Sequence, residues 1–322
     1  MPPSDAATPR PVGPVRGVCA VLEAPLTEDE ELDGPSFDRL LDRVLTSGVD
    51  GVMLPGFATE HGRLSEAERD RLVRAALERT RGDDRVVGVV SVSEQSTRLA
   101  VAAAERAVAL GADALNILPP SWLGPPLPAV RAHVATVLAA VDPLPVVVQL
   151  APAQTGAALS ADDLRELAGA HGNLAGAKVE AVPPGSVVSD LVGASPAIPV
   201  LTGYGGMFVV DGWMRGASGV QPGCSHVEVH VAIWRALEEG RIADATRLHS
   251  RLLPYLSVWM QHVDTIVAAE KRISARRGWI ATDVCRAPSR QLDARDLSLV
   301  DTFLEEFADL FSPGADGVRR GR

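Results

Sequence analysis

Lysine is rare in this chain, and its two positions are the first candidates for chemistry. Of the 31 basic residues, only Lys178 and Lys271 are lysines. A lysine can lose its proton and attack a carbonyl to form a Schiff base, whereas arginine stays protonated. Lys178 lies in the apolar run 174–179, where burial favours the neutral amine. We therefore predict that Lys178 forms an imine, with an ion pair to Glu180 as the alternative explanation.

Two further residues could move protons near Lys178. Side chains alternate along a strand, so Lys178 and Glu180 share a face, and Glu180 could act as a general acid or base. Its negative charge would also favour the protonated lysine, and the sequence leaves these opposing effects open. Tyr204 is a second candidate proton donor. It lies between Gly203 and Gly205 in a loop that could instead bind a substrate anion through its amides.

These residues fall at the ends of apolar runs that alternate with amphipathic stretches. We predict strands at residues 17–22, 51–54, 86–90, 114–118, 145–150, 174–179, 198–202 and 218–220. We predict helices between them at 36–46, 65–80, 95–110, 127–140, 160–170, 186–192 and 207–215. Eight such units indicate an α/β fold, the closed (β/α)8 or TIM barrel. An open doubly wound sheet is the weaker alternative.

The chain is divided into four segments. We expect the barrel over residues 17–225, a C-terminal helical extension over 226–311, and flexible ends at 1–16 and 312–322. Helices are predicted in the extension at 227–239, 242–276 and 294–311, with an interruption expected, if anywhere, at Pro254. These helices exceed what a barrel needs, and they could either pack on its flank or help to build an oligomer. Because acidic metabolic barrels are usually multimeric, we predict a homo-oligomer, either a dimer or a tetramer.

Composition excludes several classes of protein. With 31 basic and 41 acidic residues the net charge is −10, which argues against nucleic-acid or anionic-membrane partners. Three cysteines without C-x-x-C spacing suggest neither a disulfide framework nor zinc, and His226 and His230 lack an apparent third ligand. No apolar run is long enough to span a membrane, and we expect a cytoplasmic protein without a metal.

The ordered motifs resemble the dihydrodipicolinate synthase / N-acetylneuraminate lyase family, over about residues 17–311. The resemblance rests on these segments: Gly17-Val with Pro25-Leu, Glu60 with Leu64-Ser-x-x-Glu68-Arg69, Gly111-Ala-Asp113, Pro145-Leu-Pro-Val-Val-Val, Pro152 with Thr155-Gly156, Gly176-x-Lys178, and Arg215-Gly-Ala-x-Gly219. It implies a class I aldolase-type barrel with a C-terminal helical extension, usually a tetramer. It also implies that Lys178 is the imine lysine, that a 2-keto acid is the substrate, and that no cofactor is needed.

One departure from the family lies after the second predicted strand. Where the family usually has G-T-T-G-E or G-S-T-G-E, this chain has Gly56-Phe-Ala-Thr-Glu60. Phe57 and Ala58 replace the two hydroxyl side chains that hold the keto-acid carboxylate. Backbone N–H groups of Gly56 to Thr59 could still bind a carboxylate, and Thr59 offers a displaced hydroxyl.

Other departures concern the family's tyrosines and arginine. Gln149 replaces the catalytic tyrosine at the end of strand five. An amide can orient a carbonyl or carboxylate but cannot shuttle protons. Gln154 replaces the arginine that holds the synthases' second substrate, so dihydrodipicolinate synthesis is not expected. Trp122 aligns with a second tyrosine and, with Phe57, suggests a bulkier keto acid.

The sequence thus predicts a Schiff-base lyase or synthase of the class I aldolase type acting on a 2-keto acid. Gln221, at the end of the last strand, is a further candidate substrate contact, whereas His61 is expected at the surface. Two alternatives stay open: a dehydratase using the same lysine, and a barrel that binds a keto acid without turnover.

Overall fold

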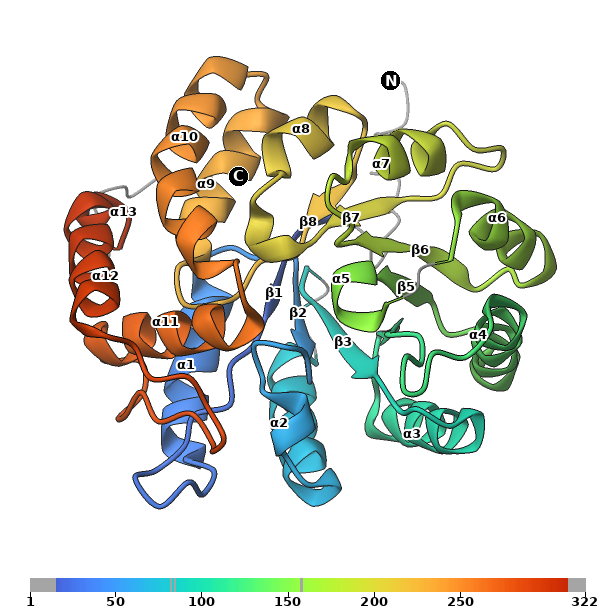
Figure 1. Ribbon diagram of the computed structural model, residues 1–322, viewed down its shortest axis with the longest axis horizontal. Coiled ribbons are helices and arrows are strands. Elements are labelled where there is room, and N and C mark those ends of the chain that lie inside the picture. Colours follow the sequence, from blue (N-terminus) through green and yellow to red (C-terminus); the bar gives the residue numbers. More distant parts are fainter. Residues whose placement is uncertain (1–15, 82, 84, 157–158, 312–322) are drawn as a thin grey trace, which may run out of the picture.

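The computed structural model describes residues 16–311 except 82, 84, 157 and 158, and its centre is a closed parallel barrel (Figure 1). Eight strands pair in chain order, and β1 closes the barrel against β8. Their bounds are β1 Gly17–Val21, β2 Gly51–Leu54, β3 Val87–Val92, β4 Ala114–Ile117, β5 Val146–Leu150, β6 Leu174–Val179, β7 Val200–Thr202 and β8 Gly219–Val220. The predicted TIM barrel is confirmed.

Helices follow the strands. Those of the barrel are α1 Gly34–Thr46, η1 His61–Arg63, α2 Glu66–Thr80, α3 Thr97–Leu110, α4 Leu127–Val141, α5 Pro152–Thr155, α6 Ala161–Ala170, α7 Gly185–Val192, η2 Tyr204–Gly206 and α8 Val209–Met214. Capping residues mark where several begin: the hydroxyl of Ser65 accepts from the Glu68 backbone, and the Glu68 carboxylate accepts from the Ser65 backbone in return. The predicted helix 207–215 is shorter than expected, because the turn η2 precedes it.

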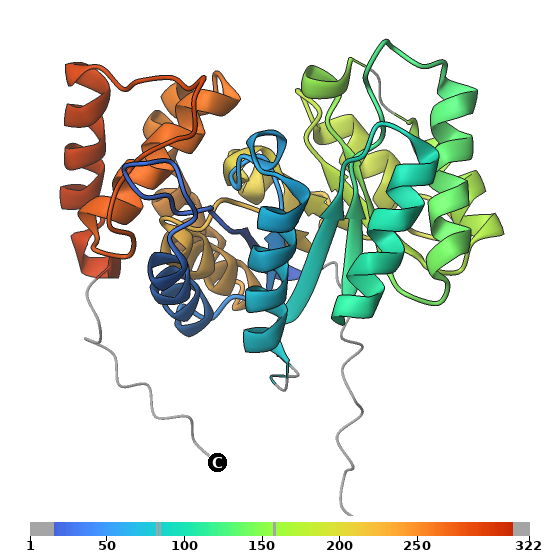
Figure 2. The ribbon, with the colours of Figure 1, turned by 90° about the horizontal axis from the view of Figure 1, so that it is seen from below.

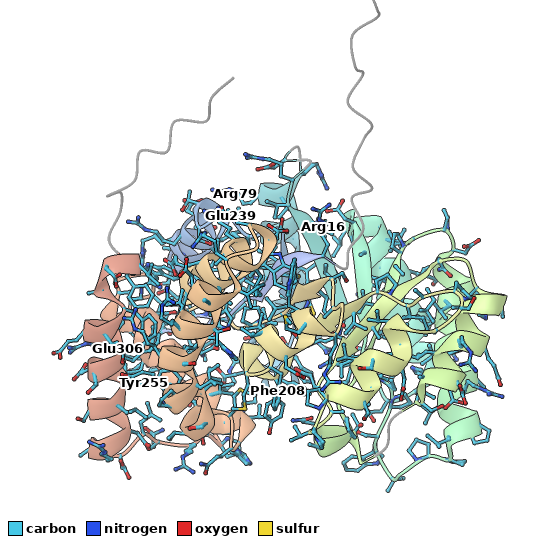
Figure 3. The ribbon with its side chains drawn as sticks, turned by 90° about the horizontal axis from the view of Figure 1, so that it is seen from above. Arg16, Arg79, Phe208, Glu239, Tyr255 and Glu306 are labelled. Atoms are coloured by element: carbon cyan, nitrogen blue, oxygen red, sulfur yellow. The ribbon has the colours of Figure 1, made fainter. Side chains whose placement is uncertain are left out.

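The C-terminal extension packs along one side of the barrel, opposite α3 and α4 (Figures 1 and 2). It comprises α10 Ile242–Trp259, α11 Val263–Arg276, α12 Ala294–Glu306 and α13 Ala308–Phe311, and it follows α9 Val227–Glu238, which comes after β8 and packs against β1. The hydroxyl of Tyr255 on α10 donates to Glu306 on α12 at 2.6 Å (Figure 3). Rings of Tyr255, Trp259, Phe303 and Phe307 pack around this contact.

The predicted position of the break in the helical stretch 242–276, at Pro254, was wrong. Helix α10 continues through Pro254, and the chain breaks after Trp259. The next helix starts where the His262 side chain accepts a hydrogen bond from the Asp264 backbone, so a capping residue, rather than the proline, separates α10 from α11.

Strand alternation sorts side chains between two cores. The main core joins the outer faces of the strands to the helices. A separate cluster of Cys19, Val21, Met53, Val89 and Ala114 fills part of the barrel interior. Val147 and Leu201 form a further small apolar cluster, and the polar residues described below lie at the carboxyl ends of the strands. None of the described helices is long and apolar enough to cross a membrane.

Candidate active site

Lys178 is a buried amine near the carboxyl end of β6. Its residue is 3% exposed, and its Nζ lies 3.3 Å from Oε1 of Glu180, which follows the strand. The two side chains therefore share the inner face, as alternation predicts. The structure thus contains the ion pair that the sequence offered as the alternative explanation for Lys178, and the imine role stays a prediction.

Glu180 is anchored by a chain of amides across the barrel interior. Gln149 Nε2 donates to Glu180 Oε2 at 2.6 Å, and Gln149 Oε1 accepts from Asn116 Nδ2 at 2.9 Å. The same Asn116 nitrogen donates to Ser91 Oγ at 3.0 Å. The register places Gln149 directly beside Lys178. Gln149 thus faces the lysine's carboxylate partner, and both ends of its amide are occupied.

The loop after β7 contacts the same carboxylate through its backbone. Tyr204 N donates to Glu180 Oε1 at 3.2 Å, and Tyr204 takes the left-handed φ of 54°. Gly203 is required here, because a Cβ at this position would lie 2.4 Å from Glu180 Cγ. Gly205 also has a positive φ, of 64°. The Tyr204 ring lies 6.1 Å from Phe208, and no partner for its hydroxyl is found within the described residues.

The loop after β2 differs from expectation at Thr59. Thr59 is fully buried. Its hydroxyl donates to the Leu22 carbonyl at 2.6 Å and accepts from Gly56 N at 2.8 Å. Thr59 and the Gly56 N–H therefore hold the loop together and are not free for a ligand. The Phe57 and Ala58 N–H groups have no acceptor in the described part of the chain, which leaves them able to bind an anion.

A small cavity of about 10 Å³, room for about one water molecule, lies beside Lys178. It is lined by Met53, Pro55, Gly56, Phe57, His61, Ser91, Ser93, Leu118, Gln149 and Lys178. His61, expected at the surface, is half-buried here. Its Nδ1 lies 3.3 Å from the Gly56 carbonyl, and burial lowers the pKa of its imidazole. The sequence predicted a surface position for this histidine and did not single out Ser91. The one signal for Ser91 was the alternation of side chains along β3, which puts it on the same inward face as Val89.

Two predicted substrate contacts lie elsewhere. Trp122, in the loop after β4, is 73% exposed and does not line this pocket. Gln221 lies inside the barrel, where its Nε2 contacts Cys19 Sγ at 3.3 Å, and it is also absent from the lining. Hydrogen bonds and the ion pair join Lys178, Glu180, Gln149 and Tyr204, and Gly56 and Phe57 line the pocket with Lys178. Within the described residues, Trp122 and Gln221 take part in neither set of contacts.

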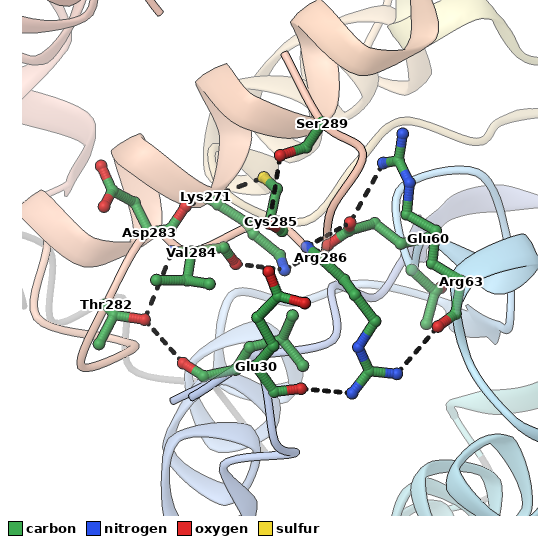
Figure 4. A network of polar contacts seen from close by, with 12 residues as sticks. Glu30, Glu60, Arg63, Lys271, Thr282, Asp283, Val284, Cys285, Arg286 and Ser289 are labelled. Carbon is green, nitrogen blue, oxygen red and sulfur yellow. Dashed lines mark hydrogen bonds and ion pairs between the residues drawn. The ribbon is translucent and has the colours of Figure 1, made fainter. Parts of the chain in front are cut away.

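The second lysine belongs to a structural network (Figure 4). Lys271, on α11, is fully buried, pairs with Glu60 and donates to the Val284 carbonyl at 2.8 Å. Glu60 also accepts from Arg63 at 3.2 Å and from the Arg286 backbone at 3.1 Å. This network ties the end of the β2 loop to the C-terminal extension, which accounts for Lys271 without chemistry.

The fold and the site together define a class: a (β/α)8 barrel with a buried lysine at the end of its sixth strand and a C-terminal helical extension. The chain belongs to the dihydrodipicolinate synthetase family, whose model matches residues 14–306. It is 28% identical over 294 residues to a 4-hydroxy-tetrahydrodipicolinate synthase of Salinibacter ruber, covering 87% of this chain and 91% of the relative. It is 30% identical to a DapA-like lyase of Halobacterium salinarum, over 92% of this chain and 95% of that one.

A solved structure shares the fold. It is YagE, a prophage protein of the dihydrodipicolinic acid synthase family from Escherichia coli K12, in complex with pyruvate. The TM-score is 0.82 at 24% identity, with 91% of this chain and 98% of that chain covered. The predicted family is confirmed by the family model, which matches residues 14–306. The chain is a lyase of a family that works through a Schiff-base lysine and without a cofactor. Among the described residues, no group of three His, Cys, Asp or Glu side chains could hold a metal ion.

Proposed function

We propose that this protein is a Schiff-base lyase or synthase in which Lys178 forms an imine with a 2-keto acid. One observation carries the proposal: a buried amine with a carboxylate 3.3 Å away lines a pocket inside the barrel. The imine would act as an electron sink for the carbanion formed on cleavage of a C–C or C–H bond. Lys178 itself supplies the chemistry that other lyases obtain from a metal or organic cofactor.

Glu180 takes the proton-transfer role that a tyrosine at position 149 would hold. The Lys178 ammonium first gives a proton to Glu180, and the free amine then attacks the keto carbon to form a carbinolamine. A proton moves from the attacking nitrogen to the oxygen as the carbinolamine forms, and Glu180 returns its proton to the same oxygen, which leaves as water to give the protonated imine. Gln149 cannot titrate, and its contribution is to hold the carboxylate through its 2.6 Å hydrogen bond.

The substrate is a 2-keto acid with an apolar substituent. Its carboxylate would bind the free N–H groups of Phe57 and Ala58. Its substituent would contact Met53, Phe57 and Leu118 after these side chains move apart, because the cavity has room for about one water molecule. Gln154 on α5 is exposed, and neither it nor Gln149 supplies the charge or phenol that the resemblance associates with dihydrodipicolinate synthesis. We therefore propose a reaction other than that synthesis, with aldol-type chemistry preferred over dehydration.

Borohydride reduction with a panel of 2-keto acids, from pyruvate to bulky aryl-substituted ones, tests the proposal. Intact mass and peptide mapping should show a reduced adduct on Lys178, formed at lower concentration with the bulkier acids. An adduct without any turnover of the acid would favour the alternative, a barrel that binds its ligand without turnover. No adduct with any acid would reject the imine.

The assembly predicted from the sequence is a homo-oligomer, a dimer or a tetramer, in the cytoplasm. Two large apolar residues in the loop after β4 support association, because they are left open to solvent: Trp122 is 73% exposed and Leu123 is 89% exposed. Light scattering of the purified protein tests it, and a monomer at micromolar concentration would contradict it.

A further inference from the structure

The hydrogen-bonded chain from Glu180 to Ser91 has a fixed direction. An ionised Glu180 can only accept, so the Gln149 group that faces it at 2.6 Å must be the NH2. Gln149 Oε1 then faces Asn116 at 2.9 Å, which requires the Asn116 NH2 on that side. The same NH2 faces Ser91 Oγ at 3.0 Å, so Ser91 is an acceptor in this chain.

Because the group of this hydrogen-bonded series that faces Ser91 is itself a donor, Ser91's own proton has no acceptor among the residues of the series. A serine hydroxyl has one O–H donor, and the only hydrogen bond that engages the hydroxyl within the described residues is the one it accepts from Asn116. Ser91 is half-buried and lines the pocket together with Lys178. Its O–H is thus a donor beside the reactive amine, and each hydrogen bond along the chain polarises the next toward it.

We propose that Ser91 is a substrate-binding residue whose hydroxyl donates a hydrogen bond to an oxygen of the 2-keto acid at Lys178. Asn116 is its positioning residue, because the Asn116 NH2 occupies the serine's acceptor side and leaves the proton for the ligand. This inference rests on the proposed imine chemistry and assigns roles to two residues of β3 and β4.

Asn116 supports the assignment by its own environment. It is 1% exposed on β4, a strand otherwise made of Ala114, Leu115 and Ile117. Its Oδ1 is buried and has no partner within the described residues, so the amide is held by its NH2 alone. Burying this amide costs free energy, which only the two hydrogen bonds of its NH2, to Gln149 and Ser91, offset.

The test measures imine trapping by borohydride as a function of pyruvate concentration. Ser91→Ala should raise the half-saturating pyruvate concentration roughly tenfold and leave the maximal trapping rate within about twofold, the loss expected for one hydrogen bond to a charged or polarised oxygen. Asn116→Asp keeps the shape but replaces the NH2 with an acceptor that faces both Ser91 Oγ and Gln149 Oε1. The serine hydroxyl then donates to the aspartate instead of to the ligand, and the contact between Gln149 and Glu180 is disturbed as well. Asn116→Asp should therefore also raise the half-saturating concentration.

Ser218→Ala is the matched control. Ser218 is also half-buried, but its hydroxyl donates to the Val200 carbonyl at 3.2 Å, just before β8 and away from the pocket. The Ser218→Ala variant should have the same half-saturating pyruvate concentration as the wild type. An unchanged half-saturating concentration in Ser91→Ala, or a fall in maximal rate alone, overturns the proposal. An absence of trapping in the wild type would instead reject the imine itself, so the two failures are distinguishable.

Discussion

Glu180 Oε1 lies 3.3 Å from Lys178 Nζ, and the rest of this carboxylate is held in place. Its other oxygen accepts from Gln149 Nε2 at 2.6 Å, and Oε1 also accepts from Tyr204 N at 3.2 Å. These donors come from β5, the end of β6 and the loop after β7. The proton acceptor nearest the amine is therefore preorganised by three neighbouring elements of the barrel.

Lys178→Arg separates the charge of the lysine from its nucleophilicity. Arginine keeps a cation near Glu180, so the folded protein should persist, but a guanidinium stays protonated and forms no imine. We expect no borohydride adduct and a loss of at least about 10³-fold in turnover. Mass spectrometry checks the loss of the adduct, and thermal unfolding of the same preparation checks that the variant is folded. Turnover at the wild-type rate would contradict the mechanism.

Glu180→Gln and Tyr204→Phe separate the two candidate proton donors. Removing the titratable carboxyl should slow imine formation by roughly 10²- to 10⁴-fold, the range of general acid–base catalysis. Tyr204→Phe keeps the backbone N–H that contacts Glu180, so its trapping rate should stay within about threefold of wild type. Single-turnover trapping kinetics measure both. A larger loss in Tyr204→Phe would assign the proton transfer to the phenol.

Most of the fold could be predicted, because each strand and helix has a local signature. All eight apolar runs became strands, and Ser65 marked the start of α2 through its capping box. The break after Trp259 could not be found in this way. It depends on the cap formed by His262, whereas Pro254, the obvious local signal, lies inside α10.

The site could be predicted where it depends on strand alternation, and not where it depends on loop geometry. Lys178 and Glu180 lie together because they are two residues apart on one strand. Thr59 and His61 were misplaced because the turn after β2 directs the Thr59 hydroxyl to the Leu22 carbonyl and folds His61 onto Gly56. No residue pattern encodes those contacts, since they depend on how the loop packs against β1.

The buried pair of Glu60 and Lys271 should matter for stability. Lys271→Met leaves Glu60 with donors from Arg63 and the Arg286 backbone, whereas Glu60→Gln leaves a buried ammonium facing the Val284 carbonyl. Breaking such a pair costs about 3–5 kcal/mol, and we expect Glu60→Gln to be the more destabilising change. Urea unfolding measures the free energies.

The matched control for that pair is an ion pair nearer the surface. Arg272 and Asp283 lie 3.1 Å apart with side chains 30% and 40% exposed, so Arg272→Met should cost no more than about 1 kcal/mol. Equal losses in the buried and exposed pairs would show that burial of Lys271 contributes little.

Glu23, just after β1, should make stability fall as pH rises. The residue is 1% exposed, and burial raises the pKa of its carboxyl to about 7, although Ser274 donates to Oε1 at 3.0 Å and Lys271 lies nearby. Burial, together with the charge of Glu23, also raises the pKa of Glu270. Because the folded state holds the Glu23 proton more tightly than the unfolded chain, stability is highest below about pH 4.5 and is lost progressively up to about pH 7.

Glu23→Gln removes this titration and keeps an acceptor for Ser274. The variant should match wild type near pH 4 and exceed it at pH 8, by an amount on the order of 3 kcal/mol, in the free energy of unfolding. Glu238→Gln, at an exposed position on α9, should show no such pH dependence. A difference between Glu23→Gln and wild type that stays constant from pH 4 to pH 8 would mean that Glu23 titrates alike in both states. Glu23 Oε2, which has no hydrogen-bond partner among the described residues, would then have to be reached by water, because hydration is what could keep a carboxylate ionised at that depth.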